Sequence, residues 1–241
     1  MTDASRLQDL LASGRPLTWV MTGDSITHGL LHTRGARNYV DHLHELIRGD
    51  LGRVQDAVIN TAISGWRMPL ILEDFERRVA TWQPDVVTIM IGTNDCSTTW
   101  VDPVVSSAEF GTGLTEFIAR VREIGAVPVL LTPPFVDLDH APDRDRLGEF
   151  ADTMRAVAAA EDAILVDIHA AFAEFSAGTG PGNEGTPWGL LDDAFHPNAA
   201  GHALMALEMA RALGLDAEES RVVADLTGRI AVARHPQWPL A

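Results

Sequence analysis

The sequence contains a single cysteine, Cys96, among its 241 residues. One thiol excludes an internal disulfide and any zinc site built from several cysteines. Nothing basic adjoins Cys96 in the sequence, so we expect a small buried residue there rather than a nucleophile.

Basic residues are also scarce. The chain has 18 Lys and Arg residues against 34 Asp and Glu residues, which gives a formal net charge of −16. Nucleic acids and anionic membranes select basic surfaces, so neither is an expected partner. We interpret the acidic surplus as a solvated surface, and nothing in it indicates an oligomeric state.

Long apolar runs are missing as well. No stretch approaches the length that spans a bilayer, and residues 1–6 show no basic segment followed by an apolar run, as a signal peptide would. We therefore expect a cytoplasmic protein. Because 46% of the residues are hydrophobic, we also expect a globular chain with a sizeable core, formed as one domain over residues 1–241.

Short apolar runs alternate with segments of helical periodicity along the chain. This alternation predicts an α/β fold, a three-layer α/β/α sandwich around a parallel sheet. The run 86–91 is apolar except for Thr88, as in a central strand covered on both faces. Pro128 weakens the prediction for the first half of its strand. The predicted strands are 17–21, 54–59, 86–91, 127–131 and 163–167, and the predicted helices are 3–13, 37–49, 67–81, 106–123, 143–160, 198–213 and 217–230. The segment 178–187 is glycine-rich and predicts a loop.

Small and polar residues follow three of these strands. Gly23 lets the chain turn sharply after the first strand, which leaves Ser25 at the carboxyl edge of the sheet, where α/β folds bind ligands. The next two strands end in Ser64-Gly65 and Asn94-Asp95. Because parallel strands bring these ends to one edge, the N–H groups of Ser25 and Gly65 and the Asn94 amide are candidate donors to the oxyanion formed when a serine attacks. Each of these turns alone fits an ordinary helix start, but together they favour a site.

A serine nucleophile also needs a base, and three histidines follow an aspartate at a spacing of three residues. The pair Asp41/His44 lies in a predicted helix and is expected to face solvent. Asp137/His140 follows the fourth strand at the functional edge and is a competing candidate. Asp193/His196 ends the long loop, where Pro197 starts a helix and would hold a histidine rigidly above the sheet. The spacing by itself does not decide between the last two pairs.

Four segments, in order, resemble the motif blocks of the SGNH hydrolases, also called the GDSL esterase family. They are Gly23-Asp24-Ser25, Gly65, Gly92-Thr93-Asn94-Asp95 and Asp193-Ala194-Phe195-His196, and the resemblance covers about residues 17–213. It implies a flavodoxin-like fold with a five-stranded parallel sheet and no metal or organic cofactor. It also implies that Ser25 is the nucleophile, His196 the base and Asp193 its orienting acid, with an oxyanion hole formed by Ser25, Gly65 and Asn94.

The sequence departs from the family pattern at one position. The second block usually reads Asn-x-Gly-x-x-Gly, and Ala62 replaces its first glycine, while Gly65 is kept. The first block also differs from the Gly-x-Ser-x-Gly elbow of α/β-hydrolases, because Thr27 stands where the second glycine would be.

Other side chains near these motifs are candidates for substrate contact or support. The candidates for substrate contact are Asp24, Trp66, Arg67 and Trp188, although Trp66 and Arg67 fit packing at a helix start equally well. Trp100 lies in a predicted loop near the same edge. His28 and His32 are expected to line or buttress the pocket, without a metal-ligating group around them.

These features predict a serine ester hydrolase for small acyl esters, with O-acetylated carbohydrates as the candidate substrate class, working through an acyl-enzyme. The alternatives are an acyl thioesterase or lysophospholipase with the same triad, and a non-catalytic carbohydrate-binding module on a retired hydrolase fold. The intact serine, asparagine, aspartate and histidine of the motifs disfavour the retired module. The predicted helical extension at 214–241 has no role that the sequence indicates.

Overall fold

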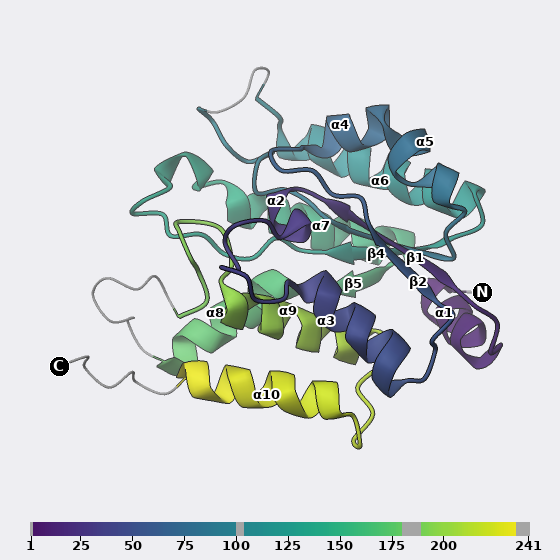
Figure 1. Ribbon diagram of the computed structural model, residues 1–241. Coiled ribbons are helices and arrows are strands. Elements are labelled where there is room, and N and C mark those ends of the chain that lie inside the picture. Colours follow the sequence, from purple (N-terminus) through teal and green to yellow (C-terminus); the bar gives the residue numbers. More distant parts are fainter. Residues whose placement is uncertain (1, 100–103, 180–188, 235–241) are drawn as a thin grey trace.

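Five parallel strands form one sheet between two layers of helices in the computed structural model of the protein (Figure 1). The structure describes residues 2–99, 104–179 and 189–234. The strand order is β2-β1-β3-β4-β5, and the strands are β1 (Thr18–Gly23), β2 (Ala57–Asn60), β3 (Val86–Met90), β4 (Val127–Leu131) and β5 (Ile164–Val166). The three-layer α/β/α prediction is confirmed.

Each face of the sheet has its own core, because successive strand residues point to opposite faces. Trp19 and Met21 of β1 pack on one face and Val20 on the other. The helices on the first face are α1 (Asp3–Ala12), α3 (Tyr39–Glu45), α8 (Ile168–Thr179), α9 (Ala199–Ala212) and α10 (Arg221–Arg234). Those on the second face are α4 (Met68–Glu73), α5 (Phe75–Arg78), α6 (Ser107–Glu123) and α7 (Leu147–Glu161). Every residue of β3 is buried, as its apolar sequence predicted.

The order of the strands in the sheet changes direction at β1. Ligands of open α/β sheets usually bind at this position. β1 pairs with β2 on one side and with β3 on the other. In open α/β sheets the crevice outside the carboxyl ends of two such strands is the usual ligand site. Ser25 follows β1 and Asn94 follows β3, so both lie at that crevice.

The predicted helix over 67–81 is broken into α4, α5 and the 3₁₀ turn η2 (Ala80–Trp82). Arg120 of α6 donates a hydrogen bond of 2.8 Å to the Leu72 carbonyl. An unbroken helix would use that carbonyl for the N–H of Glu76, so the guanidinium competes with the helical ladder where α4 ends. The predicted helix over 37–49 also changes character, since α3 runs into a single π-helical turn, η1 (Leu46–Asp50).

Pro128 lies inside β4 despite the expectation that it would weaken the strand. It pairs with Val87 of β3, whereas the pairing of β4 with β5 begins only at Val129. Pro128 therefore lies where β4 pairs with a strand on one side only. Proline is tolerated there because no hydrogen bond from its backbone nitrogen is needed on the open side.

Helix α8 was not predicted, although three of its buried residues, Ile168, Phe172 and Phe175, recur at helical spacing.

Cys96 is fully buried, and burial raises the pKa of its thiol to about 12, as expected for a packing residue. Within the part of the chain that the structure describes, no helix combines the length and apolar character needed to cross a membrane. The assignment of residues 1–241 to one domain stays a prediction.

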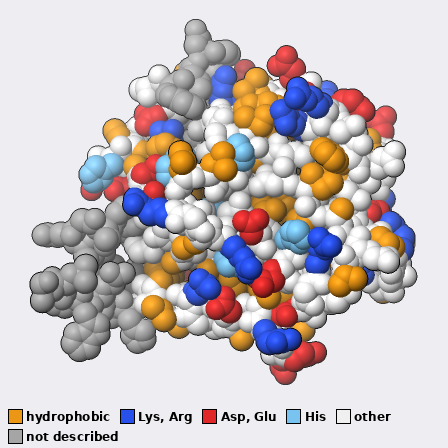
Figure 2. Space-filling view, in the orientation of Figure 1, with side chains coloured by type: hydrophobic (Ala, Val, Ile, Leu, Met, Phe, Trp, Pro, Cys, Tyr) orange, Lys and Arg blue, Asp and Glu red, His pale blue; other side chains and the backbone are white. Residues whose placement is uncertain are grey.

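The surface drawn in Figure 2 carries acidic and basic side chains interspersed with one another. No broad basic patch is visible on this face. The distribution agrees with the interpretation of the acidic surplus as a solvated surface.

Candidate active site

Ser25 is the first residue of α2 (Ser25–His28), a single helical turn that begins directly after β1. The turn requires glycine at position 23, because a Cβ there would lie 2.3 Å from the carbonyl oxygen of Met90. Asp24 caps α2, accepting a hydrogen bond of 3.0 Å from the Ile26 N–H. Because Ser25 opens the helix, its own N–H has no intrahelical acceptor and is available to a ligand.

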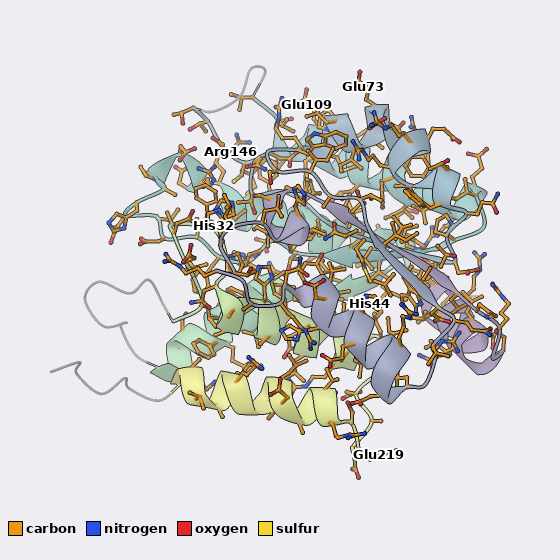
Figure 3. The ribbon with its side chains drawn as sticks, viewed as in Figure 1. His32, His44, Glu73, Glu109, Arg146 and Glu219 are labelled. Atoms are coloured by element: carbon orange, nitrogen blue, oxygen red, sulfur yellow. The ribbon has the colours of Figure 1, made fainter. Side chains whose placement is uncertain are left out.

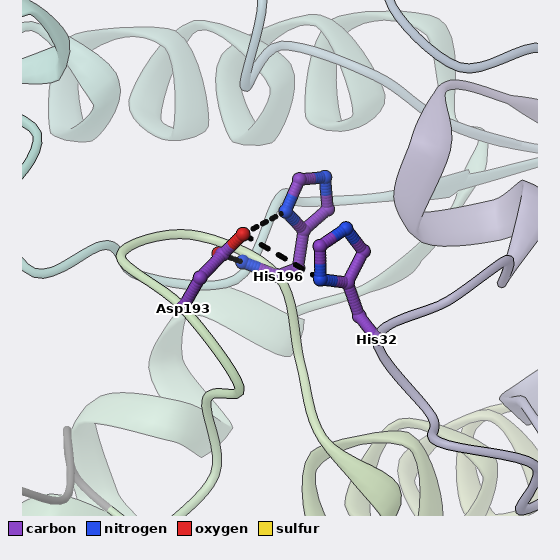
Figure 4. A group of neighbouring side chains, drawn as sticks. All are labelled: His32, Asp193 and His196. Atoms are coloured by element: carbon purple, nitrogen blue, oxygen red, sulfur yellow. Dashed lines mark hydrogen bonds and ion pairs between the residues drawn. The ribbon is translucent and has the colours of Figure 1, made fainter.

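Ser25, His196 and Asp193 form a continuous hydrogen-bonded chain. Ser25 Oγ lies 2.9 Å from His196 Nε2, and His196 Nδ1 lies 2.8 Å from Asp193 Oδ2. The Asp193–His196 contact is drawn in Figure 4. The other oxygen, Asp193 Oδ1, accepts the backbone N–H groups of Phe195 and His196. The imidazole thus has one nitrogen on a carboxylate and the other on a hydroxyl, the arrangement of a serine hydrolase.

Hydrogen bonds to backbone groups hold the loop that carries Asp193 and His196. The Asp192 N–H donates to the His196 carbonyl at 2.8 Å. Asn198 caps α9 and donates from its amide to the carbonyls of Gly189 and Leu191. These bonds fix the loop immediately before and after the histidine, so the ring starts from a defined backbone position.

Asp193 is held in its ionised form. Burial acts to raise its pKa, but hydrogen bonds from the His196 ring and from the N–H groups of Phe195 and His196 outweigh that effect and hold the pKa of Asp193 well below its ordinary value. At neutral pH the carboxylate therefore carries a negative charge, which stabilises an imidazolium at His196.

The candidate oxyanion donors lie on neighbouring strand ends. The Asn94 amide donates to the Trp66 carbonyl at 3.1 Å, and it keeps a second N–H. Gly65 has a φ of +82°, a conformation that favours glycine. Asp95 Oδ1 accepts the Met68 N–H at 2.8 Å. Two consecutive residues after β3 therefore hold the loop that contains Gly65.

Two buried carboxyl groups lie beneath this edge. Asp24 and Asp95 are 1% and 0% exposed, and burial raises the pKa of each to about 7. One oxygen of each group has no hydrogen-bond partner among the residues that the structure describes. Asp24 is therefore a cap under the site, and its burial does not support the sequence expectation that it touches substrate.

The remaining predicted substrate residues are placed differently. Trp66 and Arg67 are partly exposed next to Gly65, and the guanidinium of Arg78 lies 5.2 Å from the centre of the Trp66 ring. Trp188 and Trp100 fall outside the described residues.

Of the competing Asp/His pairs, Asp137 and His140 do contact each other, with His140 Nδ1 2.7 Å from Asp137 Oδ2. The His140 side chain is 76% exposed, and the ring paired with Ser25 is that of His196. The Asp41 side chain instead belongs to the capping box of α3. The structure thus brings Asp193/His196, and not the other two pairs, to the serine.

His32 lies next to His196, where the sequence predicted only that it would line or buttress the pocket. Its ring stacks on the His196 ring, with centroids 3.7 Å apart and planes 5° apart. Its Nδ1 lies 3.3 Å from Asp192 Oδ2. The same atom lies 3.5 Å from Asp193 Oδ2, a contact drawn in Figure 4. Asp192 was not predicted from the sequence. Its position directly before Asp193 was the signal that could have identified it. His28 lies at Ser64, with 3.2 Å between Nδ1 and Oγ.

Contrary to the sequence expectation, potential metal ligands do gather here. Donor atoms of His32, Asp193 and His196 lie within 4.8 Å of one another. Two rings stacked 3.7 Å apart and nearly parallel cannot both place one ion in their planes unless a ring turns. Both Nδ1 atoms also face carboxylates, which favours N–H there rather than a free lone pair. The arrangement therefore fits hydrogen bonding better than metal coordination.

Comparisons with known proteins agree with this geometry. Residues 21–204 match the model of the GDSL-like lipase/acylhydrolase family. The chain is 25% identical to an acetylxylan esterase of Geobacillus stearothermophilus, over 88% of this chain and 99% of that protein.

Two solved structures are similar over most of their length. LAE5, described as an α/β hydrolase enzyme from the metagenome of Lake Arreo in Spain, has a TM-score of 0.69 at 27% identity, covering 84% of this chain and 98% of that one. A mutant of Axe2, an acetyl-xylooligosaccharide esterase from Geobacillus, has a TM-score of 0.70 at 25% identity, covering 85% and 97%. The chain thus belongs to the GDSL-like lipase/acylhydrolase family and is a serine-type carboxylic ester hydrolase.

Proposed function

We propose that the protein hydrolyses small acyl esters, with O-acetylated carbohydrates as its substrates, and that Ser25, His196 and Asp193 are its catalytic triad. The observation that carries the proposal is the 2.9 Å contact between Ser25 Oγ and His196 Nε2, continued at 2.8 Å to Asp193. This geometry supplies a nucleophile, a base within hydrogen-bond reach and an acid that orients the base.

In the proposed reaction, Ser25 Oγ attacks the ester carbonyl while His196 Nε2 takes its proton. The negative charge of Asp193 stabilises the imidazolium that forms. The tetrahedral oxyanion accepts hydrogen bonds from the N–H groups of Ser25 and Gly65 and from the Asn94 amide. His196 then protonates the leaving alcohol, and a water molecule activated by the same base hydrolyses the acyl-enzyme.

The proposed substrate class follows from the relatives and from the residues beside Gly65. The esterase that the chain matches almost end to end is named for acetylxylan, and the similar structure Axe2 for acetylated xylooligosaccharides. Trp66 and Arg67, an aromatic and a basic residue, are both partly exposed. Such a mixture suits a hydroxylated leaving group better than an alkyl chain.

The acyl-chain preference tests the proposed substrate class. An enzyme with a long apolar groove gains roughly 0.8 kcal/mol for each buried methylene, about fourfold in kcat/KM per carbon. We expect the opposite trend, with the highest kcat/KM for acetyl or propionyl esters and a fall by octanoyl. The measurement is kcat/KM for p-nitrophenyl esters from acetate to decanoate, together with acetate release from acetylated xylooligosaccharides. A maximum at octanoate or longer would reject the small-acyl proposal in favour of a lysophospholipase or thioesterase.

The proposed oxyanion hole predicts a specific effect at Asn94. Replacing it by alanine is expected to lower kcat by roughly a hundredfold to a thousandfold, the usual loss for one such donor. KM should change little, because the hydrogen bond strengthens in the transition state. Asn94→Asp is the matched variant, since it keeps the shape but offers acceptors only, and it should lose at least as much. If either variant changed KM alone, Asn94 would bind the substrate without stabilising the oxyanion.

A further inference from the structure

The His32 ring covers one face of the His196 imidazole. The two planes are nearly parallel, 5° apart, with the centroids separated by 3.7 Å, which is full face-to-face contact between the rings. His32 comes from the loop between α2 and α3, far from His196 in the sequence. The His196 side chain is 12% exposed, and the His32 ring is one of the groups that cover it, together with the Phe195 ring at 4.4 Å between centroids.

His32 is itself held in place by Asp192. The His32 Nδ1 lies 3.3 Å from Asp192 Oδ2, and the other oxygen, Oδ1, accepts a hydrogen bond of 2.6 Å from Arg34 Nε. One carboxylate beside the catalytic aspartate therefore anchors two side chains of the same loop. The loop keeps this shape although Leu31 and Arg34 have φ values of +68° and +51°, a region that non-glycine residues adopt only when their surroundings impose it.

The orientation of the His196 ring is the quantity that such a stack controls. Rotation about χ2 of a histidine is soft, because this torsion joins an sp³ to an sp² atom. His196 needs a single value of this χ2 torsion, because Nε2 must face Ser25 while Nδ1 faces Asp193. A ring turned by a few tens of degrees would lose both contacts. The stacked plane of His32 opposes that rotation by steric contact.

We propose that His32 is a positioning residue for catalysis, which holds the His196 imidazole by stacking and is itself anchored by Asp192. The inference rests on the proposed role of His196 as the base. In this role His32 takes no proton from Ser25 and contacts no reacting atom. Its contribution lies in the fraction of molecules whose His196 is aligned before the ester arrives.

Three substitutions separate the stack from the hydrogen bond. His32→Ala removes both and is expected to lower kcat about tenfold to a hundredfold, since small misplacements of catalytic groups cost up to that much. KM should stay within about twofold, because substrate binding does not depend on the alignment of His196. His32→Phe keeps an aromatic plane and is expected to recover most of kcat. His32→Asn keeps an N–H for Asp192 without a ring, and it should remain close to the alanine variant.

The matched control is His44→Ala. His44 lies on α3, well apart from His32 in Figure 3, and contacts Arg48 at 2.9 Å, so wild-type activity is expected. The rate of Ser25 labelling by a fluorophosphonate gives a second readout that needs no ester, and it should fall in His32→Ala by the same factor as kcat. Thermal melting of each variant, together with the recovery in His32→Phe, separates misalignment from misfolding.

Two results would overturn the positioning role: a kcat for His32→Ala within twofold of the wild type, or recovery by asparagine and not by phenylalanine. Both are read against Ser25→Ala in the same assay. If the Ser25→Ala variant stayed active, the proposed triad would be wrong instead, and the two failures are thereby distinguished.

Discussion

Replacing Ser25 by alanine is expected to abolish ester hydrolysis, with kcat lowered by about 10⁵-fold or more, the scale of loss seen when a triad serine is removed. The reason is the geometry of the hydroxyl. Ser25 Oγ is the oxygen paired with His196 Nε2 at 2.9 Å, so without it no nucleophile stands beside the base. The fold should persist, because the helix cap at this turn comes from Asp24 rather than from Ser25.

The measurement combines steady-state hydrolysis of p-nitrophenyl acetate with covalent labelling. A fluorophosphonate probe should modify Ser25 in the wild type, as located by peptide mapping, and should leave the Ser25→Ala variant unlabelled. Ser64→Ala is the matched control. The Ser64 hydroxyl contacts a different histidine, His28, at 3.2 Å, so this variant should keep both activity and labelling. Labelling at Ser64, or full activity in Ser25→Ala, would contradict the assignment.

The layered fold follows from patterns that are local in the sequence. The run of β3, apolar except for Thr88, predicts a strand covered on both faces, and all of its residues are buried. The polar residues after β1 and β3 predict a site at one edge of the sheet, because parallel strands end there together. Ser25 and Asn94 could be predicted from the sequence because each lies within a few residues of the end of its strand. The position of that strand in the sheet then determines where the residue lies.

What the sequence could not provide depends on contacts between distant loops. His32 and Asp192 are 160 residues apart and meet at 3.3 Å, and no periodicity or spacing reports such a contact. The break between α4 and α5 is similar, since it coincides with a hydrogen bond from Arg120, 48 residues further along the chain. Burial is also decided by packing: Asp24 adjoins Ser25 in the sequence, yet it is 1% exposed and lies beneath the site.

The choice of base shows the same limit and leads to the second large prediction. Asp137/His140 and Asp193/His196 have identical spacing and nearly identical local geometry, with contacts of 2.7 Å and 2.8 Å. Their loops are even joined, because the Asp137 N–H donates to the Ala194 carbonyl at 2.7 Å. A short sequence motif cannot separate two such pairs. The resemblance of the four motif blocks implied Asp193/His196, and the three-dimensional path of the chain brings that pair, rather than Asp137/His140, to Ser25.

His196→Ala is expected to lower kcat by on the order of a thousandfold or more, as the loss of a triad base does in other serine hydrolases. His140→Ala should leave kcat within a few-fold of the wild type, because its side chain is 76% exposed and the ring beside Ser25 is that of His196. Any effect at His140 should appear in KM rather than in kcat, since the His140 ring is not the one paired with the serine hydroxyl. Steady-state kinetics of both variants with p-nitrophenyl acetate, and the labelling rate of Ser25, provide the comparison. A large kcat loss in His140→Ala beside a small one in His196→Ala would make His140 the base. The contact between Ser25 and His196 would then have to be replaced by another in the working enzyme.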